Sequence, residues 1–577
     1  MKPWPQWSHP FAVRLLAPCI LLLAVSCGPA AAPTPTATPS APRPPQPTAT
    51  ASEATPTVAL ATPTPTATPL PTPTRVAPRR GGSLRRVIFR DPSTFDVQQA
   101  SSVVELMTAA HLYNNLLWNP EGEVIECDVC SSWELQDGGK ALLFHLLDTP
   151  SFADGHRVTA GDVKYSLDKM MGLVDDFVSP RAGLIKEYIQ QVEAPDARTV
   201  VLRLHRPAAA LPSMLTMQFA AIYRQGATRQ GLQHEPDGTG PFLLKARDLG
   251  AQIRLERNTN YFKPGLPYLD RLDLIVIGNP VTGSAAFLTN NVDIGQGPSR
   301  DTVSQYEAKR KAGQVDWLER PKECRPQGVM INSTRPPFDN PKLRQAVNLA
   351  IDRWGYIEVV HEGRAEPALV FRAGIGSRRS REEIVAFPGF ATGTAKEAER
   401  AQARQLLTEA GYPRGLDVVM TVRNAPDYLV QGQFIAGELA KVGIRTTLEV
   451  LDVAALYPKT SRLDYALWPF WFCQTTTDPD EVWAGYFLTG GSRNWLGYSN
   501  EEVDRLFAQQ SQALDPARRA LLNRRMEDLV MADLPFAPTA DQQEVLAWWT
   551  HVGGYAEGQG LTTYTSLRGE RWWRKPR

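Results

Sequence analysis

The residues able to do catalytic or metal chemistry are scattered along this chain. The sequence contains no G-x-S-x-G elbow, no G-x-x-x-x-G-K-[ST] loop, no H-E-x-x-H pair and no G-x-G-x-x-G turn. Its eight histidines, at positions 9, 111, 145, 156, 205, 234, 361 and 551, never stand three or four residues apart. We therefore expect no catalytic constellation, no metal site and no other cofactor, and we predict that the protein is not an enzyme.

One acidic group comes closest to acid–base chemistry. Asp478, Asp480 and Glu481 stand together in "TTTDPDEVW". Asp-Pro-Asp is first of all a pattern of turns and helix caps, because a short carboxylate side chain accepts hydrogen bonds from nearby backbone N–H groups. We therefore favour a structural or ligand-contacting role for Asp478 over a catalytic one.

Aromatic residues are concentrated in one stretch. Residues 465–498 contain ten of them, where the chain-wide 9% predicts about three. They are Tyr465, Trp468, Phe470, Trp471, Phe472, Trp483, Tyr486, Phe487, Trp495 and Tyr498. Part of this set must be core, but rings also give a large contact area at little cost in conformational entropy. We predict that two or three of them line a ligand cleft, with Trp471, Phe472 and Trp495 as the candidates.

The composition indicates a largely globular chain. Of its 577 residues 43% are hydrophobic, which is enough for two or three domains. There are 62 basic and 61 acidic residues, and the net charge is +1. That balance gives no electrostatic reason to expect nucleic acid or an anionic membrane surface as a partner.

The N-terminus resembles an export signal. Lys2 and Arg14 come before an apolar run over 15–25, which is too short to span a bilayer core of ~30 Å. The small residues before Cys27 resemble the bacterial lipobox, with Ala24 where leucine is usual. We predict a signal peptide over 1–27 and lipidation of Cys27, which would hold the exported protein on the outer face of the cytoplasmic membrane. An uncleaved anchor, or an ordinary signal with an incidental cysteine, is the alternative.

A Pro/Thr-rich segment follows the signal. Residues 28–81 contain 15 of the 48 prolines of the chain and almost no charge before Arg75. Proline fixes φ and removes a hydrogen-bond donor, so this segment is predicted to be a disordered spacer that favours polyproline II. Its threonines also permit O-glycosylation.

Four cysteines lie in the predicted folded part, at positions 127, 130, 324 and 473. Cys127 and Cys130 form a C-x-x-C with no second pair and no nearby histidine, so zinc is not expected. In an exported protein this pair fits a local disulfide as well as two buried thiols, and the sequence leaves both open.

The pattern from Gly82 onward predicts a mixed α/β fold. "LDVVMTVR", "VQGQFIAGELAKVG" and "IRTTLEVLD" form a strand, a helix and a strand over 416–423, 430–443 and 444–452, which is a βαβ unit with a parallel pair. The other elements that we predict are a strand over 83–90 and helices over 158–170, 339–351, 501–512 and 516–532. The helix over 158–170 begins with a capping box formed by Thr159 and Asp162, and the helix over 339–351 begins at an Asn340-Pro341 start.

Several stretches together resemble one known family, the extracytoplasmic solute-binding proteins of family 5. "FADGHRVTAGDVKYSL" is similar to its most specific signature, and "GTGPFLLKARDLG" resembles its G-T-G-P segment. "INSTRPPFDNPKLRQAVNLAIDR" and "NWLGYSNEEVDRLF" are also similar to family motifs. The matches run in order from about residue 82 to 550, which is nearly all of the predicted folded chain.

This resemblance implies a two-lobed α/β fold of the periplasmic-binding-protein class, type II-like, with the ligand between the lobes. It implies lobe I over 82–275, with a small subdomain near 115–225, lobe II over 276–536, and a return to lobe I over 537–577. It also adds three motif residues, Phe152, Gly240 and Asn332, to the expected ligand contacts.

The implied function is capture of a solute and its delivery to an ABC permease by a monomeric lipoprotein. In peptide-binding relatives an Asp anchors the peptide ammonium, and here Thr475 takes its place, which speaks against a standard peptide. A chelated nickel ion is not supported either, because no histidine cluster is present. An unusual peptide, an oligosaccharide or another polar metabolite fits the sequence. A binding lipoprotein with a sensor or adhesin role and a secreted hydrolase are the alternatives.

Overall fold

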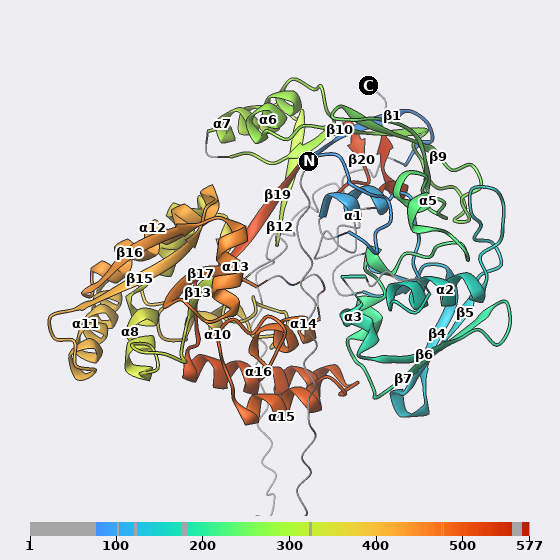
Figure 1. The fold of residues 1–577 in the computed structure, drawn as a ribbon. Coiled ribbons are helices and arrows are strands. Elements are labelled where there is room, and N and C mark those ends of the chain that lie inside the picture. Colours follow the sequence, from blue (N-terminus) through green and yellow to red (C-terminus); the bar gives the residue numbers. More distant parts are fainter. Residues whose placement is uncertain are drawn as a thin grey trace, which may run out of the picture. The chain divides into compact units, whose positions relative to one another are not determined.

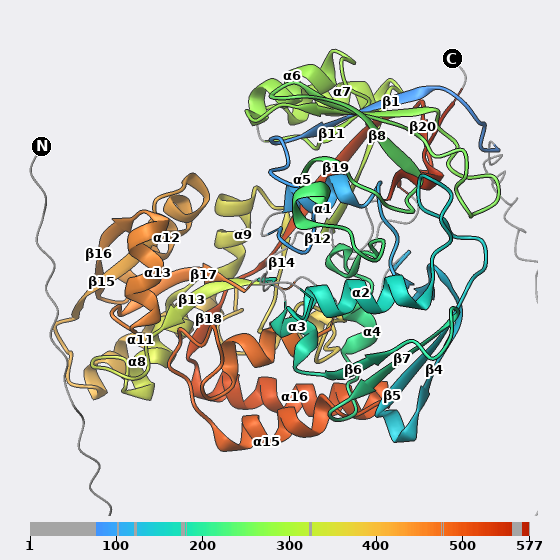
Figure 2. The same cartoon turned by 45° about the vertical axis from the view of Figure 1, so that its right-hand side comes forward.

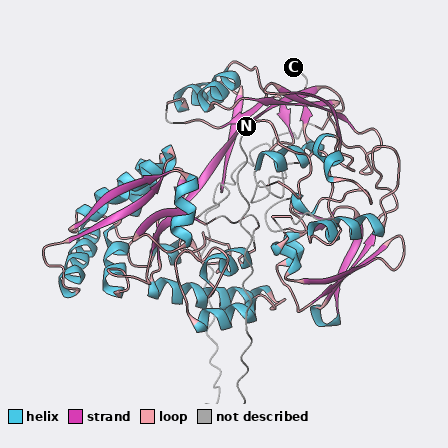
Figure 3. Ribbon diagram, in the orientation of Figure 1, coloured by secondary structure: helices cyan, strands magenta, loops and turns pink. Residues whose placement is uncertain are grey.

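The computed structural model describes residues 77–100, 103–120, 124–174, 179–180, 182–299, 301–321, 326–472, 474, 476, 478–556 and 568–575. All of them belong to one compact unit, Arg75–Arg577. The predicted signal peptide and Cys27 lie outside the described residues, as do most of the predicted spacer, Cys324, Cys473 and Thr475. Figure 3 shows both helices and strands throughout the described fold. They alternate along the chain, which is the α/β class expected from the sequence.

The first large sheet has eight strands and is mixed. Seven strands follow the order β12-β19-β11-β1-β10-β9-β8, and β14 pairs with β19. Its strands are β1 Ser83–Ile88, β8 Phe242–Asp248, β9 Gln252–Arg257, β10 Arg271–Val276, β11 Ile294–Gln296, β12 Val315–Pro321, β14 Ala365–Glu366 and β19 Asp541–Trp549. β1 runs parallel to β10 and β11, and the remaining neighbours are antiparallel. We call the part of the protein built on this sheet lobe I.

A subdomain belongs to lobe I and carries its own antiparallel sheet. The strand order is β4-β5-β7-β6, with β4 Cys130–Gln136, β5 Ala141–Leu146, β6 Ile189–Glu193 and β7 Thr199–Leu204. Helix α2, Ala160–Met170, packs along this sheet, as Figures 1 and 2 show. Two short pairs complete the strands of lobe I, β2 Leu117–Trp118 with β3 Glu126–Cys127 and β20 Val552–Gly553 with β21 Trp573–Arg574.

Short helices join the strands of lobe I. They are α1 Val103–Ala109, α3 Gly183–Lys186, α4 Leu211–Met214, α5 Arg229–His234, α6 Pro280–Leu288 and α7 Val303–Lys311. The hydrophobic core of the lobe is continuous between the large sheet and the subdomain, because Leu84, Ile253, Phe144 and Leu167 belong to one buried cluster.

The second large sheet has five strands, and we call the part built on it lobe II. Its order is β16-β15-β17-β13-β18, with β13 Gln327–Ile331, β15 Leu416–Arg423, β16 Ile444–Leu451, β17 Leu467–Trp471 and β18 Phe536–Pro538. Its helices are α8 Pro341–Ala350, α9 Arg353–His361, α10 Arg381–Val385, α11 Gly393–Glu409, α12 Pro426–Ala440, α13 Val453–Ser461, α14 Asp480–Val482, α15 Glu501–Gln510 and α16 Pro516–Asp533. α15 and α16 lie side by side in Figures 1 and 2.

The chain passes between the two large sheets at two main crossings, and between these crossings the short strand β14 pairs with β19 of the first sheet. It leaves the first sheet at the end of β12 and enters the second at β13, and it returns from β18 to β19 through Thr539 and Ala540. The boundary expected at residue 276 does not coincide with this crossing, because β11 and β12 pair with β19 in the lobe I sheet. Long-range pairing of this kind leaves no local signal in the sequence.

The predicted local elements of lobe II agree closely with the structure. β15 and β16 are parallel, with Leu416 opposite Ile444 and Arg423 opposite Leu451, as the predicted βαβ unit requires. The predicted helix starts agree as well, since Asn340 caps α8 and Asp515 caps α16. α12 begins four residues earlier than predicted, because Pro426 occupies its first turn, where a missing N–H is harmless.

In lobe I the capping box of α2 is confirmed. The Thr159 side chain accepts from the Asp162 backbone, and the Asp162 side chain accepts from the Thr159 backbone. The question left open at the C-x-x-C is answered, because Cys127 and Cys130 form a disulfide.

Asp128 lies between these cysteines in what we call the lobe I charge cluster: Asp128, Lys263, Arg568 and Glu570. Arg568 donates to both Asp128 oxygens at 2.8 Å each, and Lys263 Nζ lies 2.9 Å from Asp128 and 3.2 Å from Glu570. Burial alone would raise the pKa of Asp128, but the charges of Arg568 and Lys263 hold it well below its usual value. The cluster therefore stays ionised while it joins three distant segments of the chain.

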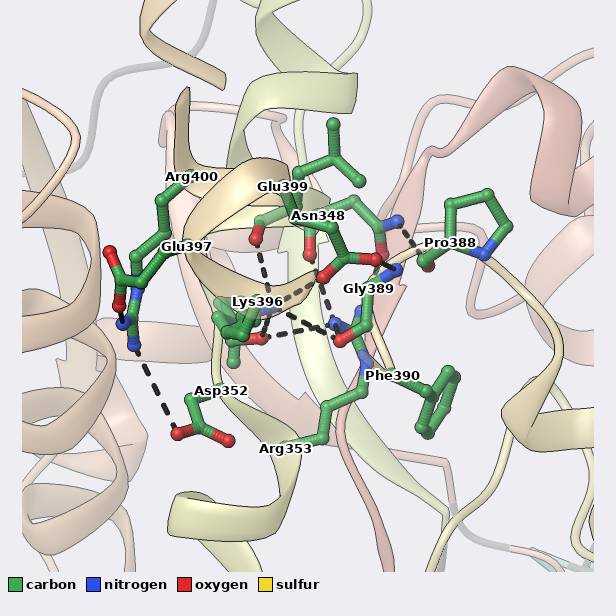
Figure 4. Close-up of polar contacts among 12 residues, drawn as sticks. Asn348, Asp352, Arg353, Pro388, Gly389, Phe390, Lys396, Glu397, Glu399 and Arg400 are labelled. Atoms are coloured by element: carbon green, nitrogen blue, oxygen red, sulfur yellow. Dashed lines mark hydrogen bonds and ion pairs between the residues drawn. The ribbon is translucent and has the colours of Figure 1, made fainter. Parts of the chain in front are cut away.

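Lobe II contains a second buried group, the lobe II charge cluster: Asn348, Arg353, Lys396 and Glu399 (Figure 4). Arg353 donates to the carbonyls of Pro538, Asn348, Ile351 and Gly389 at 2.7–3.2 Å. Lys396 Nζ donates to the carbonyls of Leu349, Ile351 and Gly389 and to Glu399. Burial, with the charge of Arg353, lowers the pKa of Lys396 to about 8, and burial lowers that of Arg353 to about 10.

Candidate ligand-binding site

The chain order in lobe II creates a crevice at one end of β15. This strand has β16 on one side and β17 on the other, and all three are parallel. The chain runs from β15 through α12 to β16, and then through α13 to β17 on the opposite side of β15. From β17 the chain leads away from β15, toward β18 at the far edge of the sheet. In open α/β sheets ligands bind at the carboxyl ends of two adjacent strands whose connections leave in opposite directions, here β15 and β17.

Three side chains are stacked at this end of the sheet. Trp471 is the last residue of β17, and its ring centroid lies 3.7 Å from that of Tyr428 in the first turn of α12. The guanidinium of Arg423, the last residue of β15, lies 5.2 Å from the Tyr428 ring. Arg423 Nε is buried and has no hydrogen-bond partner among the described residues. The stack thus places a cation with an unused donor beside the start of α12.

A cleft of about 690 Å³ opens beside this stack. Lobe II contributes its wall from α9 and α12, which includes His361, Pro426, Asp427, Val430 and Gln431. The opposite wall belongs to lobe I and includes Arg86, Phe89 and the segment Gln296–Ser299 after β11. The floor is formed by β12 and β19, the strands next to the two crossings. A volume of this size accommodates a small organic solute or a short peptide.

The charged groups along the cleft largely neutralise one another. Arg320 is paired with Glu544 across β12 and β19. Arg364 lies 3.6 Å from Glu362 and donates to the carbonyl of Pro298. Four glutamines, at positions 296, 431, 542 and 543, add neutral hydrogen-bonding groups. The described wall is therefore polar without a strong excess of either charge.

Gln431 is the one glutamine of this wall whose position demands a partner. It is 1% exposed, on the sheet-facing side of α12, one turn after Tyr428. Its Oε1 atom is buried and has no hydrogen-bond partner in the described part of the chain. Because an amide oxygen only accepts, a group brought to it must carry an N–H or O–H.

Of the residues predicted from the sequence, Trp471 and Trp495 come nearest to a binding role. Both are partly exposed, and Trp471 supports the Tyr428 ring beside the cleft. Trp495 packs among Tyr457, Trp468 and Phe470, with ring centroids 5.4–5.6 Å apart. Neither residue belongs to the described wall of the cleft.

Four other predicted residues are held within the fold. Phe152 and Phe472 are 0% exposed, each in the hydrophobic core of its lobe. A Cβ at Gly240 would lie 2.3 Å from the carbonyl carbon of Leu112, so only glycine fits there. Asn332 donates its amide to the carbonyls of Leu463 and Tyr465. The family motifs at these positions have structural explanations.

Asp478 lies outside the cleft, at a contact between lobe II and the subdomain. It is paired with Arg519, and its Oδ1 accepts from the backbone of Asp480, which is the turn chemistry expected of Asp-Pro-Asp. Arg519 and Gln510 also donate to Asp480, while Tyr188 of the subdomain donates to its other oxygen at 3.2 Å. Burial, followed by the Asp478 charge, raises the pKa of Asp480 to about 6.

Sequence reasoning missed the residues of the cleft wall, Gln431 among them, and it missed Arg423 and Tyr428 in the stack beside that wall. The βαβ prediction over 416–452 already carried a usable signal, because the turn after a parallel strand and the first turn of the next helix face the binding edge of such a sheet. No local signal marked the lobe I wall at Gln296 or the floor on β19, since their pairing is long-range.

Within the described residues no group of three His, Cys, Asp or Glu side chains is placed to hold a metal ion. None of the helices that the structure describes combines the length and the apolarity needed to cross a membrane.

Comparison with known families identifies the chain. The model of the bacterial extracellular solute-binding proteins, family 5 (middle part), matches residues 125–494. This chain belongs to family 5. Its two-lobed α/β fold is that of the periplasmic binding proteins, whose solved structures it matches. Relatives in this family are binding proteins of transport systems that work outside the cytoplasm.

The relatives differ in what they bind. The glutathione-binding protein GsiB of Escherichia coli (strain K12) is 25% identical over 483 residues, 80% of this chain and 90% of GsiB. The periplasmic binding protein DppA of Helicobacter pylori, solved with the peptide STSA, has a TM-score of 0.70 at 23% identity, covering 86% of this chain and 99% of DppA. AgaA from A. tumefacien R10, solved with agropinic acid, has a TM-score of 0.69, also at 23% identity, and covers 86% and 99%.

Proposed function

We propose that this family 5 protein is the solute-binding lipoprotein of an ABC importer and is not an enzyme. It captures a peptide-like or other polar solute between its lobes and delivers it to a membrane permease. The observation that carries the proposal is the cleft of about 690 Å³, whose walls come from both lobes and whose floor is formed by the strands next to the crossings. A solute that touches both walls favours the closed arrangement by its differential affinity for it.

The wall also indicates what the solute brings. Gln431 in the wall offers an unused amide oxygen, and Arg423 in the stack beside the wall offers an unused N–H. We infer that the solute carries both a hydrogen-bond donor and an acceptor. Glutathione, the peptide STSA and agropinic acid, the ligands named for the relatives, all have both. We propose Trp471 and Trp495 as supports of the aromatic side of the site. We place lobe I at 77–321 with 541–575 and lobe II at 326–538, with the short strand β14 of the latter range paired to the lobe I sheet.

The test is a pair of matched valine substitutions. Val430 is 42% exposed in the cleft wall, and Val419 is 48% exposed on β15, outside that wall. Calorimetry with glutathione, the peptide STSA and agropinic acid, and with any solute that native mass spectrometry finds on the purified protein, gives the reference affinities. Val430→Trp is expected to weaken binding at least tenfold by filling the cleft, whereas Val419→Trp leaves it unchanged. Equal affinity in both variants would place the site elsewhere, and turnover of a bound solute would make the protein an enzyme.

Membrane attachment has its own test. We propose that Cys27 is lipidated and that residues 28–81 tether the lobes to the membrane. Cys27→Ser is expected to release the protein or to leave the precursor uncleaved. A processed form of this variant that stays on the membrane would refute lipidation. Genes for a permease and an ATPase beside this one would favour import over a sensor or adhesin role.

A further inference from the structure

Lobe I and lobe II also touch outside the cleft, where the subdomain meets the ends of α14 and α15. The Tyr188 hydroxyl donates to Asp480 at 3.2 Å. The backbone N–H of Ala209 donates to the carbonyl of Ser511 at 3.0 Å, and Arg206 Nη1 lies 3.5 Å from the Ser511 hydroxyl. We call these five residues the subdomain contact. None of them belongs to the described wall of the cleft.

The subdomain contact is built as a surface that can separate. Among the described residues, the hydrophobic clusters on its two sides are distinct, so parting the lobes here uncovers no shared core. A cavity of about 310 Å³ adjoins it, lined by Trp133 and Ala209 from the subdomain and by Leu514 and Arg519 from lobe II. Domains joined by small polar contacts of this kind move relative to each other more readily than domains that share a core.

Two carboxylates and one cation are enclosed on the lobe II side of this contact. Arg519 of α16 is paired with both Asp478 and Asp480. Gln510 of α15 donates to Asp480 at 2.6 Å and brings no charge. Asp480 is 0% exposed, so solvent does not stabilise its negative charge while the lobes are together.

The other groups around the Asp480 carboxyl leave this balance unchanged. The subdomain faces it with the neutral hydroxyl of Tyr188. The charged groups beside Tyr188 are Glu187 and Arg206, and they are paired with each other. Glu481, the next residue of α14, has an ion pair of its own. One arginine therefore serves two enclosed carboxylates.

This arrangement couples the contact to pH. Burial, followed by the Asp478 charge, raises the pKa of Asp480 to about 6. When the lobes part, water reaches the carboxyl and its pKa returns toward the ordinary value. The joined lobes therefore bind a proton at Asp480 more tightly than the parted lobes, and a fall in pH favours the joined arrangement. Protonated Asp480 keeps its bond to Tyr188, because the hydroxyl oxygen also accepts.

We propose that the subdomain contact is a latch that holds the two lobes together and that acid tightens. The bond between Tyr188 and Asp480 is its main element, and the latch sets how readily the lobes part. It acts whether or not a solute is bound. Measurements on the solute-free protein therefore test it separately from the proposed transport function.

Hydrogen exchange at the Ala209 amide measures how often the latch opens, because the acceptor of this amide lies on the other lobe. Tyr188→Phe removes the hydroxyl and keeps the ring, and it is expected to speed this exchange about tenfold. The His205 amide donates to the Tyr188 carbonyl at 3.0 Å and reports local loosening, so its exchange should not change. An unchanged rate at Ala209, or an equal increase at His205, would overturn the proposal.

Tyr165→Phe is the matched control. The Tyr165 hydroxyl donates to the Ala227 carbonyl at 2.8 Å, and both residues belong to lobe I. This variant loses a buried hydroxyl without touching the subdomain contact, so exchange at Ala209 should stay as in the wild type. An acceleration as large as that of Tyr188→Phe would show a general loss of stability and refute the latch.

The acid dependence is tested at the same amide, with each rate divided by the intrinsic exchange rate at that pH. From pH 7.5 to 5.5 the corrected wild-type rate is expected to fall about fourfold, which follows from a pKa of about 6 in the joined arrangement. Asp480→Asn has no titratable group at this position, and its corrected rate should be the same at both pH values. A wild-type rate that does not fall, or an equal fall in the variant, would overturn the proposal.

Discussion

In the lobe I charge cluster Arg568 is bonded to both oxygens of a carboxylate, whereas in the lobe II charge cluster Arg353 is bonded to backbone carbonyls (Figure 4). Both arginines are buried. The first faces a full negative charge on Asp128, and the second faces dipoles, with Glu399 bonded instead to Lys396. The pKa of Asp128 is held below its usual value, while the pKa values of Arg353 and Lys396 are lowered.

The difference shows two uses of a buried cation. Ion pairing joins segments that are far apart in sequence, here residues 128, 263 and 568, and fixes the C-terminal return to lobe I. In the second cluster Arg353 donates to the carbonyl of Asn348, in the last turn of α8, where no helix N–H is left to bond the carbonyls. It also donates to the carbonyl of Gly389 in a loop. Removal of a partner leaves a bare charge in the first cluster and unsatisfied dipoles in the second.

The largest effect is expected from Arg568→Met. It leaves the buried Asp128 carboxylate with Lys263 as its remaining cation, and loss of one partner of a buried pair costs about 3–5 kcal/mol. Urea unfolding of the mature protein measures the loss. Arg335→Met is the control, because the Arg335 side chain is 57% exposed and its ion-pair partner Asp464 is exposed as well, and its effect should stay within about 0.5 kcal/mol. Equal effects for the two variants would show that the pairing contributes little.

A smaller loss is expected from Arg353→Met. It leaves the carbonyls of Asn348, Gly389 and Pro538 short of a donor but strands no charge, so about 2–3 kcal/mol is expected by the same measurement. Arg381→Met, whose side chain is 50% exposed, is its control. A loss larger than that of Arg568→Met would reverse the comparison between the clusters.

The smallest expected effect is a pH dependence of the free energy of unfolding, which arises from the titration of Lys396. Its pKa is about 8 in the folded protein against 10.5 for the free side chain, so between these values the unfolded chain binds more protons. The free energy of unfolding therefore rises with pH across this window. This contribution from Lys396 is lost as the pH falls through 8. Relative to Lys396→Met, the wild-type free energy of unfolding should increase by about 1–2 kcal/mol from pH 8 to 10.5. A difference between the two proteins that does not change with pH would contradict the lowered pKa.

Much of the fold could be predicted from local patterns in the sequence. The parallel pair over 416–452 follows from two β-rich runs around an amphipathic helix, and Asn340-Pro341 and Asp515-Pro516 mark helix starts because their side chains and fixed φ act within a few residues. The aromatic stretch was only partly interpretable. Trp468 and Phe472 entered the core and Trp471 stayed at its edge, which depends on strand pairing rather than on composition.

The sequence by itself determined the α/β class, the family motifs and most helix starts, because these depend on neighbours along the chain. Only the tertiary structure decided that β11 and β12 belong to lobe I, that Cys127 and Cys130 are bonded, and that Gln431 faces the cleft. It also decided that Asp128 meets Arg568 across 440 positions of the chain. Contacts of that range arise when separate elements pack together, and single residues carry no local trace of them.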